Sequence, residues 1–136
     1  MNQTITYTHR GAGGTITKTI TVAGDQESRL SIPFASDASD VLIDIFIPDN
    51  QVKAITFLAD QDCTLEFNDN SGTLGTITLT ANLPVYYFDG CAWTYDSVMG
   101  FAGAAGDITA MYLTNTSDPA AAGTLSIIML IDATPA

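Results

Sequence analysis

The chain has 136 residues, of which 46% are hydrophobic and 14% are charged, and its formal net charge is −11. This length fits one domain with a sizeable core. The acidic surface repels phosphate backbones and anionic lipid headgroups, which excludes nucleic-acid and membrane-surface binding as expected functions. No apolar run approaches the ~20 residues that span a bilayer. No basic segment followed by an apolar one opens the chain, so we expect no secretory signal.

Strict alternation marks the first 22 residues. Threonine occupies every second position of 4–8 and again of 15–21, and apolar or aromatic residues fill most of the positions between. A period of two places the threonines on one face of a strand. Glycines between the two runs supply a turn. We predict that residues 1–22 form an extended N-terminal arm or an edge hairpin of a single domain spanning 1–136.

Similar patterns recur about every ten residues, with Gly, Asn, Asp or Pro between them, which is typical of an all-β sandwich or barrel. No segment has a helical period of useful length. We predict an antiparallel, jelly-roll-like β-sandwich of about eight to ten strands. The candidate strands are 4–9, 15–22, 28–34, 40–47, 52–59, 64–68, 75–81, 84–88, 107–115 and 124–132.

Two of these strands, 41–47 and 125–131, are apolar on both faces. In a two-layer sandwich only one of those faces meets the core, so the other must be covered by a loop, a neighbouring subunit or a larger partner. Because so short a chain has little material for a third layer, we favour contact with a neighbouring subunit.

The segment 89–106 is the irregular part of the chain. It gathers Trp93, Tyr95, Met99 and Phe101 among glycines and alanines. Aromatic residues and Met are enriched at interface hot spots, and small residues allow close backbone approach. The segment is therefore either an interaction surface or a loop that folds its own aromatic rings over the end of the sandwich.

Side chains suited to catalysis are scarce. The one histidine, His9, alternates in register with Ile5 and Tyr7, which indicates a structural or interfacial role. Cys63 and Cys91 lie far apart and show no metal or redox spacing, so we expect two thiols rather than a disulfide. No nucleophile elbow, phosphate-binding loop or zinc-protease motif is present. We therefore predict that the protein is not an enzyme.

The carboxylates allow two further interpretations. Asp60, Asp62 and Glu66 are close in sequence, but a glycosidase also needs a cleft that a small sandwich has little room to build. Oxygens of 60–62 and of 68–72 from adjacent loops would suit calcium, although both segments are also good turns. We expect no cofactor and keep calcium as an alternative.

Carbohydrate binding is the main rival to a purely structural role. Small β-sandwiches stack sugar rings on exposed aromatic side chains, and nearby polar groups orient the hydroxyls. The residues that fit this use are Trp93, Tyr86, Tyr87 and Tyr95, with Asp89 or Asp96.

Three segments combine strand patterns with distinctive turns or ends. They are 52–68, with its Asp-Gln-Asp turn, the threonine-rich 75–85, with its Ala-Asn-x-Pro turn, and 107–115, which ends in Leu-Thr-Asn. Together these segments resemble the β-sandwich decoration, or cement, proteins of tailed bacteriophages. The resemblance covers about the last two thirds of the chain and carries no catalytic residue.

This resemblance implies a virion protein made in the host cytoplasm. It would bind the outer surface of the phage head and bridge neighbouring major capsid protein subunits. It would also bind itself, and we favour a homotrimer over a dimer. The residues that we expect to make contact are Ile5, Tyr7, His9, Arg10, Trp93, Tyr95, Met99 and Phe101.

Overall fold

The computed structural model describes residues 1–72, 74–101 and 106–133, and in this part it leaves out the side chains of Tyr7 and His9. The fold is all-β, which confirms the predicted class. A 3₁₀ turn, η1 (Asp49–Gln51), and a one-turn helix, α1 (Tyr95–Val98), interrupt the strands. The strands are β1 (Asn2–Gly11), β2 (Gly14–Ala23), β3 (Gln26–Phe34), β4 (Val41–Ile47), β5 (Val52–Ala59), β6 (Cys63–Phe67), β7 (Thr76–Leu79), β8 (Val85–Phe88), β9 (Ile108–Asn115) and β10 (Gly123–Ile131).

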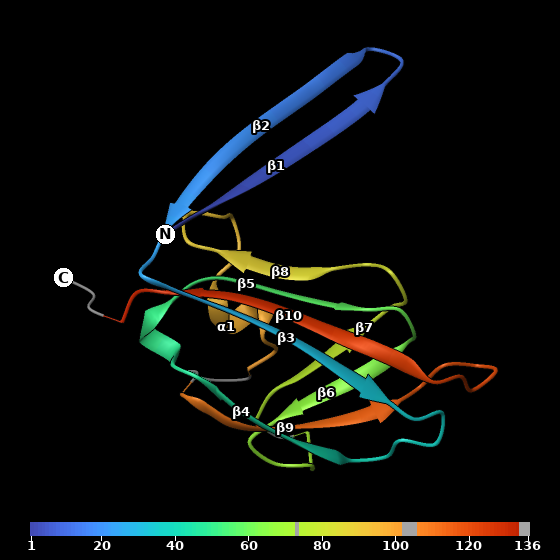
Figure 1. The fold of residues 1–136 in the computed structure, drawn as a ribbon. Helices are drawn as coiled ribbons and strands as arrows, with labels where there is room; N and C mark the ends of the chain where they lie inside the picture. Colours follow the sequence, from blue (N-terminus) through green and yellow to red (C-terminus); the bar gives the residue numbers. More distant parts are fainter. Residues whose placement is uncertain (73, 102–105, 134–136) are drawn as a thin grey trace.

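Eight strands form two four-stranded antiparallel sheets, in the orders β3-β10-β5-β8 and β4-β9-β6-β7 (Figure 1). The chain changes sheet at every connection between β3 and β10 except the β6–β7 hairpin. This strand order is that of an eight-stranded jelly roll, a double-sheet architecture. The jelly-roll expectation is therefore confirmed.

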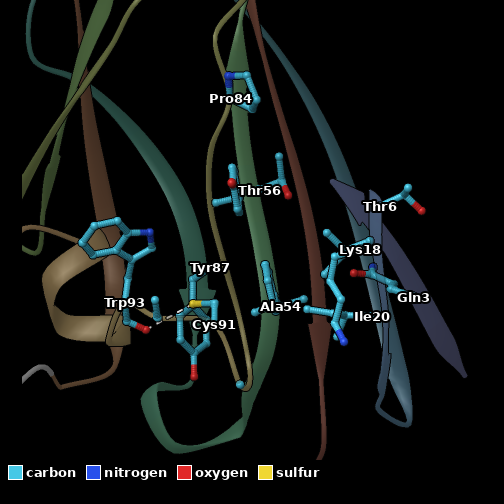
Figure 2. Close-up of a pocket in the computed structure, with 15 residues that line it drawn as sticks. Gln3, Thr6, Lys18, Ile20, Ala54, Thr56, Pro84, Tyr87, Cys91 and Trp93 are labelled. Atoms are coloured by element: carbon cyan, nitrogen blue, oxygen red, sulfur yellow. Dashed lines mark hydrogen bonds between the residues drawn. The ribbon is translucent and has the colours of Figure 1, made fainter. Parts of the chain in front are cut away.

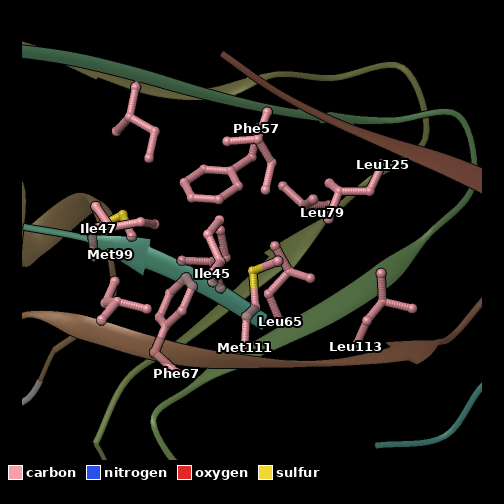
Figure 3. Packing of buried hydrophobic residues seen from close by; sticks show 14 of the residues in the cluster. Ile45, Ile47, Phe57, Leu65, Phe67, Leu79, Met99, Met111, Leu113 and Leu125 are labelled. Atoms are coloured by element: carbon pink, nitrogen blue, oxygen red, sulfur yellow. The ribbon is translucent and has the colours of Figure 1, made fainter. Parts of the chain in front are cut away.

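The core lies between the two sheets and follows the period of two (Figure 3). On β5, Ile55, Phe57 and Ala59 are fully buried, whereas Thr56 and Leu58 between them face outward. The rings of Phe57 and Phe67 meet across the layers with centroids 6.2 Å apart. Burial of such alternate positions on each strand supplies the hydrophobic free energy that holds the sheets together.

The first two strands leave the sandwich as a separate two-stranded sheet, and in Figure 1 this hairpin projects well beyond the rest of the molecule. Its pairs run from Asn2 opposite Ala23 to Gly11 opposite Gly14. The threonines of the two strands lie opposite one another, so one face of the hairpin is a threonine ladder. We name β1 and β2 the hairpin arm and residues 24–133 the body.

The two strands that are apolar on both faces are covered differently. On β10, Leu125 and Ile127 face the core, and Leu130 on the other side is fully buried beneath Val22 of the hairpin arm. On β4, Leu42 and Phe46 stay 59% and 58% exposed. The outer face of β10 is therefore partly covered by the hairpin arm of the same chain, and not by a neighbouring subunit as we expected.

Candidate functional site

The hairpin arm is anchored at its base. Val22 is buried against Ala54, Phe88 and Leu130 of the body, and Ile5 and Ile20 pack around this cluster. At the junction, Gly24 comes so close to β10 that an added Cβ would lie 2.6 Å from the carbonyl oxygen of Ile131. Such an approach admits only glycine without movement of the backbone. The base of the arm is thus held on the body, and the described side chains of its outer half are not part of this cluster.

A groove of about 540 Å³ separates the hairpin arm from the outer face of β5 and β8 (Figure 2). We name it the arm groove. Residues of β1 and β2 line it on one side, residues of β5 and β8 line it on the other, and residues 90–93 after β8 complete the lining. The lining residues are Gln3, Ile5, Thr6, Lys18, Ile20, Ala54, Thr56, Pro84, Tyr86, Tyr87, Phe88, Gly90, Cys91, Ala92 and Trp93.

Two exposed aromatic side chains stand in the arm groove. Trp93 is 63% exposed and Tyr86 is 43% exposed. The Tyr86 ring stacks on Phe88 of the same strand with an interplanar angle of 5°, which fixes its orientation. Tyr87, the next residue of β8, turns inward, and its ring meets the ring of Tyr95 edge-on with centroids 5.6 Å apart. Only Trp93 and Tyr86 of the four predicted sugar-stacking residues therefore present large exposed surfaces.

The structure separates the interface residues that we predicted in the irregular segment. Met99 is fully buried and Tyr95 is only 9% exposed, so both side chains pack in the core of the sandwich, and their contact with a partner stays a prediction. A one-turn helix that begins at Tyr95 turns them inward, and the Thr94 hydroxyl caps it by accepting from the Ser97 amide at 3.2 Å. Residues 102–105 of the segment lie outside the described residues.

Phe101 packs partly buried on the core, where its ring stacks on Phe67 at 6.0 Å. The loop interpretation of the segment therefore holds for three of its four large side chains, and Trp93 is the exception.

On the arm, Ile5 is half-buried against the body and Arg10 is exposed near the tip. The backbones of Tyr7 and His9 pair with Lys18 and Ile16, and their side chains lie outside the described residues. Contact at these positions remains a prediction.

The side chains proposed as calcium ligands accept hydrogen bonds from backbone amides. Asp60 accepts from the Thr124 amide at 2.7 Å, and Asp62 accepts from the Ala81 amide at 2.7 Å. Asn68 accepts from the Thr109 amide at 2.8 Å. These hydrogen bonds satisfy backbone groups that would otherwise be unpaired. Among the described residues no group of three or more His, Cys, Asp or Glu side chains is arranged to hold a metal ion.

Burial raises the pKa of several side chains, among them Cys63 and Asp49. Burial raises the pKa of the Cys63 thiol to about 11, and the nearby carboxylates of Asp62 and Asp60 add to the shift. Cys63 and Cys91 are free thiols. Partial burial raises the pKa of Asp49, and repulsion by Asp96 and Asp107 adds to it.

The chain matches no protein-family model, no curated protein and no solved structure. In the ranges that the structure describes, no helix has the length and apolar character needed to span a bilayer. The arm, its groove and the exposed apolar side chains are thus the features from which a function can be inferred.

Proposed function

We propose that this protein is a structural component of a tailed-phage virion. In this role it binds the outer surface of the head and bridges neighbouring major capsid protein subunits, as a homo-oligomer and preferentially a homotrimer. The proposal assigns no catalytic step to the chain.

The observation that carries the proposal is the projecting hairpin arm. Strands of ten residues extend roughly 33 Å at about 3.3 Å per residue. Among the described residues of the arm, those that pack in the cluster with the body lie at its base, so the outer half can reach a neighbouring protein. An arm of this kind offers backbone edges and a threonine ladder for contact, as in recognition by strand addition.

Surface chemistry supports the same role. Trp93, Leu42 and Phe46 expose large apolar side chains on the body, which suits contact with other proteins. The net charge of −11 suits the outside of a shell whose interior holds DNA. On a repeating lattice, several modest contacts per oligomer add up through effective concentration.

A co-sedimentation experiment tests the proposal. A major capsid protein gene is expected beside the gene for this chain, and shells assembled from that capsid protein should retain the wild-type chain through a sucrose cushion. Trp93→Ala should lower retention, whereas Leu83→Ala, at a side chain of similar exposure (60%), serves as the matched control. A wild-type chain that stays in the supernatant would contradict the proposal.

A second candidate function is carbohydrate binding in the arm groove. Besides the rings of Trp93 and Tyr86, the groove is lined by Gln3, whose side-chain nitrogen is buried without a hydrogen-bond partner in the described structure. A buried donor without a partner is costly, and a ligand hydroxyl would satisfy it.

A glycan array with the purified protein tests this second function. Binding that is lost in both Tyr86→Ala and Gln3→Leu would favour it over the virion role. Absence of binding by the wild-type chain would remove it.

A further inference from the structure

Charge is divided unequally between the arm and the body. All 15 acidic side chains lie in residues 24–136 together with Arg29 and Lys53, so this part carries a formal charge of −13. The first 23 residues contain Arg10 and Lys18 and no acidic residue, so they carry +2. The arm is therefore a cationic projection on an anionic body, and its complement is an acidic protein surface.

Arg10 and Lys18 of the arm are in neither of the ion pairs found in the described part of the chain. The ion pairs there are Arg29 with Glu27 and Lys53 with Asp89, and all four residues belong to the body. Lys18 is exposed although it lines the arm groove, and it lies two residues from Ile16, so both side chains are on the same face of β2. Ile16 is 67% exposed, which is the largest exposure among the large hydrophobic residues of the described chain.

The outer face of β4 carries the matching pattern. Leu42, Asp44 and Phe46 are exposed and alternate with the inward-facing residues of the strand, so an anion stands between two apolar side chains. We name these three residues the β4 patch. Because strand residues two apart are about 7 Å apart on either surface, a Lys18–Asp44 pair places Ile16 against Leu42 or Phe46 in register.

The arm cannot reach the β4 patch of its own chain. β4 belongs to the second sheet, and in Figure 1 the hairpin arm projects from the opposite side of the sandwich, past the β3-β10-β5-β8 sheet. The patch and the arm tip therefore meet only when they belong to different copies.

We propose that the tip of the hairpin arm docks on the β4 patch of a second copy of this chain. The Lys18 ammonium faces the Asp44 carboxylate, and Ile16 covers apolar surface beside it. The contact joins two different surfaces, so it is head-to-tail and closes into a ring when the rotation permits. This inference names the surfaces for the self-association that is part of the proposed function, and it rests on that part alone.

A charge-swap experiment tests the pairing. The molar mass of the full-length protein is measured by light scattering during size-exclusion chromatography over a range of concentrations. We expect the wild type to be oligomeric, and Lys18→Glu or Asp44→Lys to raise the dissociation constant about tenfold, since each change turns attraction into repulsion. The double variant Lys18→Glu/Asp44→Lys should restore the oligomer. Arg29→Glu, which changes the net charge equally on the body, is the control and should associate as the wild type does.

Several results would overturn the inference. They are a monomeric wild type, single variants as oligomeric as the wild type, or a double variant no better than the singles. Retention on capsid shells is scored separately. If the wild-type protein is monomeric but still binds shells, the docking inference is wrong and the virion role stands. If the charge swap breaks and restores the oligomer as expected but the protein does not bind shells, the docking inference stands and the virion role is wrong.

Discussion

Truncation of the anchor side chain, Val22→Ala, should release the hairpin arm from the body. Val22 is only 5% exposed and packs on Leu130, which is fully buried. The change removes two methyl groups at about 0.8 kcal/mol each. The remaining cavity raises the loss to about 2 kcal/mol. An isolated two-stranded hairpin is marginally stable in water, so the order of the arm depends on this contact.

Hydrogen exchange followed residue by residue measures the effect. Because about 1.4 kcal/mol corresponds to a factor of ten, amides paired between β1 and β2 should exchange about thirtyfold faster in Val22→Ala. Amides between β5 and β10 should keep their rates. At a protein concentration below that of self-association, Ile16→Ala is the matched control, since this residue lies on the same hairpin and is 67% exposed. Equal acceleration in the sandwich, or none in the arm, would refute the anchoring role of Val22.

Three further predictions concern the body. Met99→Ala should lower the free energy of unfolding by about 2–5 kcal/mol, because this side chain is fully buried, whereas Trp93→Ala should cost less stability and weaken shell binding more. Urea denaturation measures both losses, and equal losses would contradict the placement of Met99 in the core and of Trp93 on the surface. Cys63 should resist Ellman's reagent in the folded protein at pH 8, because its thiol is buried and has a raised pKa, and it should react when the protein unfolds. Immediate reaction of both Cys63 and Cys91 in the native protein would disprove the burial of Cys63. The pKa of Asp49 is raised in the folded state, so its contribution to stability is present below its unfolded pKa and is lost as pH rises through the folded pKa. Asp49→Asn should therefore raise the thermal unfolding temperature at pH 7 but not at pH 3, and a variant that is less stable than the wild type at pH 7 would contradict this.

Alternation in the sequence was sufficient to predict the strands. Each of the ten predicted segments overlaps one observed strand, because a period of two and a turn residue are local signals that the sandwich preserves. The jelly-roll order also agrees with the expectation. In the hairpin arm, the alternating threonines of the two strands lie opposite one another from Thr4 and Thr21 to Thr8 and Thr17.

The site was harder to predict, because it depends on contacts between distant residues. The segment of Tyr95 and Met99 has no strand period, so the sequence could not indicate that a single capped helical turn directs both side chains into the core. The arm groove joins Gln3 to Tyr86 and Trp93, which are more than 80 positions away in the chain. The shielding of Leu130 by Val22 is non-local in the same sense. The exposure of Trp93 agrees with the interaction-surface interpretation, which rested on composition alone.

We propose that this chain works by binding other protein surfaces on the outside of a phage head. The most direct measurement is electron cryomicroscopy of shells assembled from the neighbouring major capsid protein, with and without this chain. We predict additional density on the outer surface, at contacts between adjacent capsid subunits and with the hairpin arm extended across them. Shells that remain bare at saturating protein, or density confined to the inner surface, would contradict the claim.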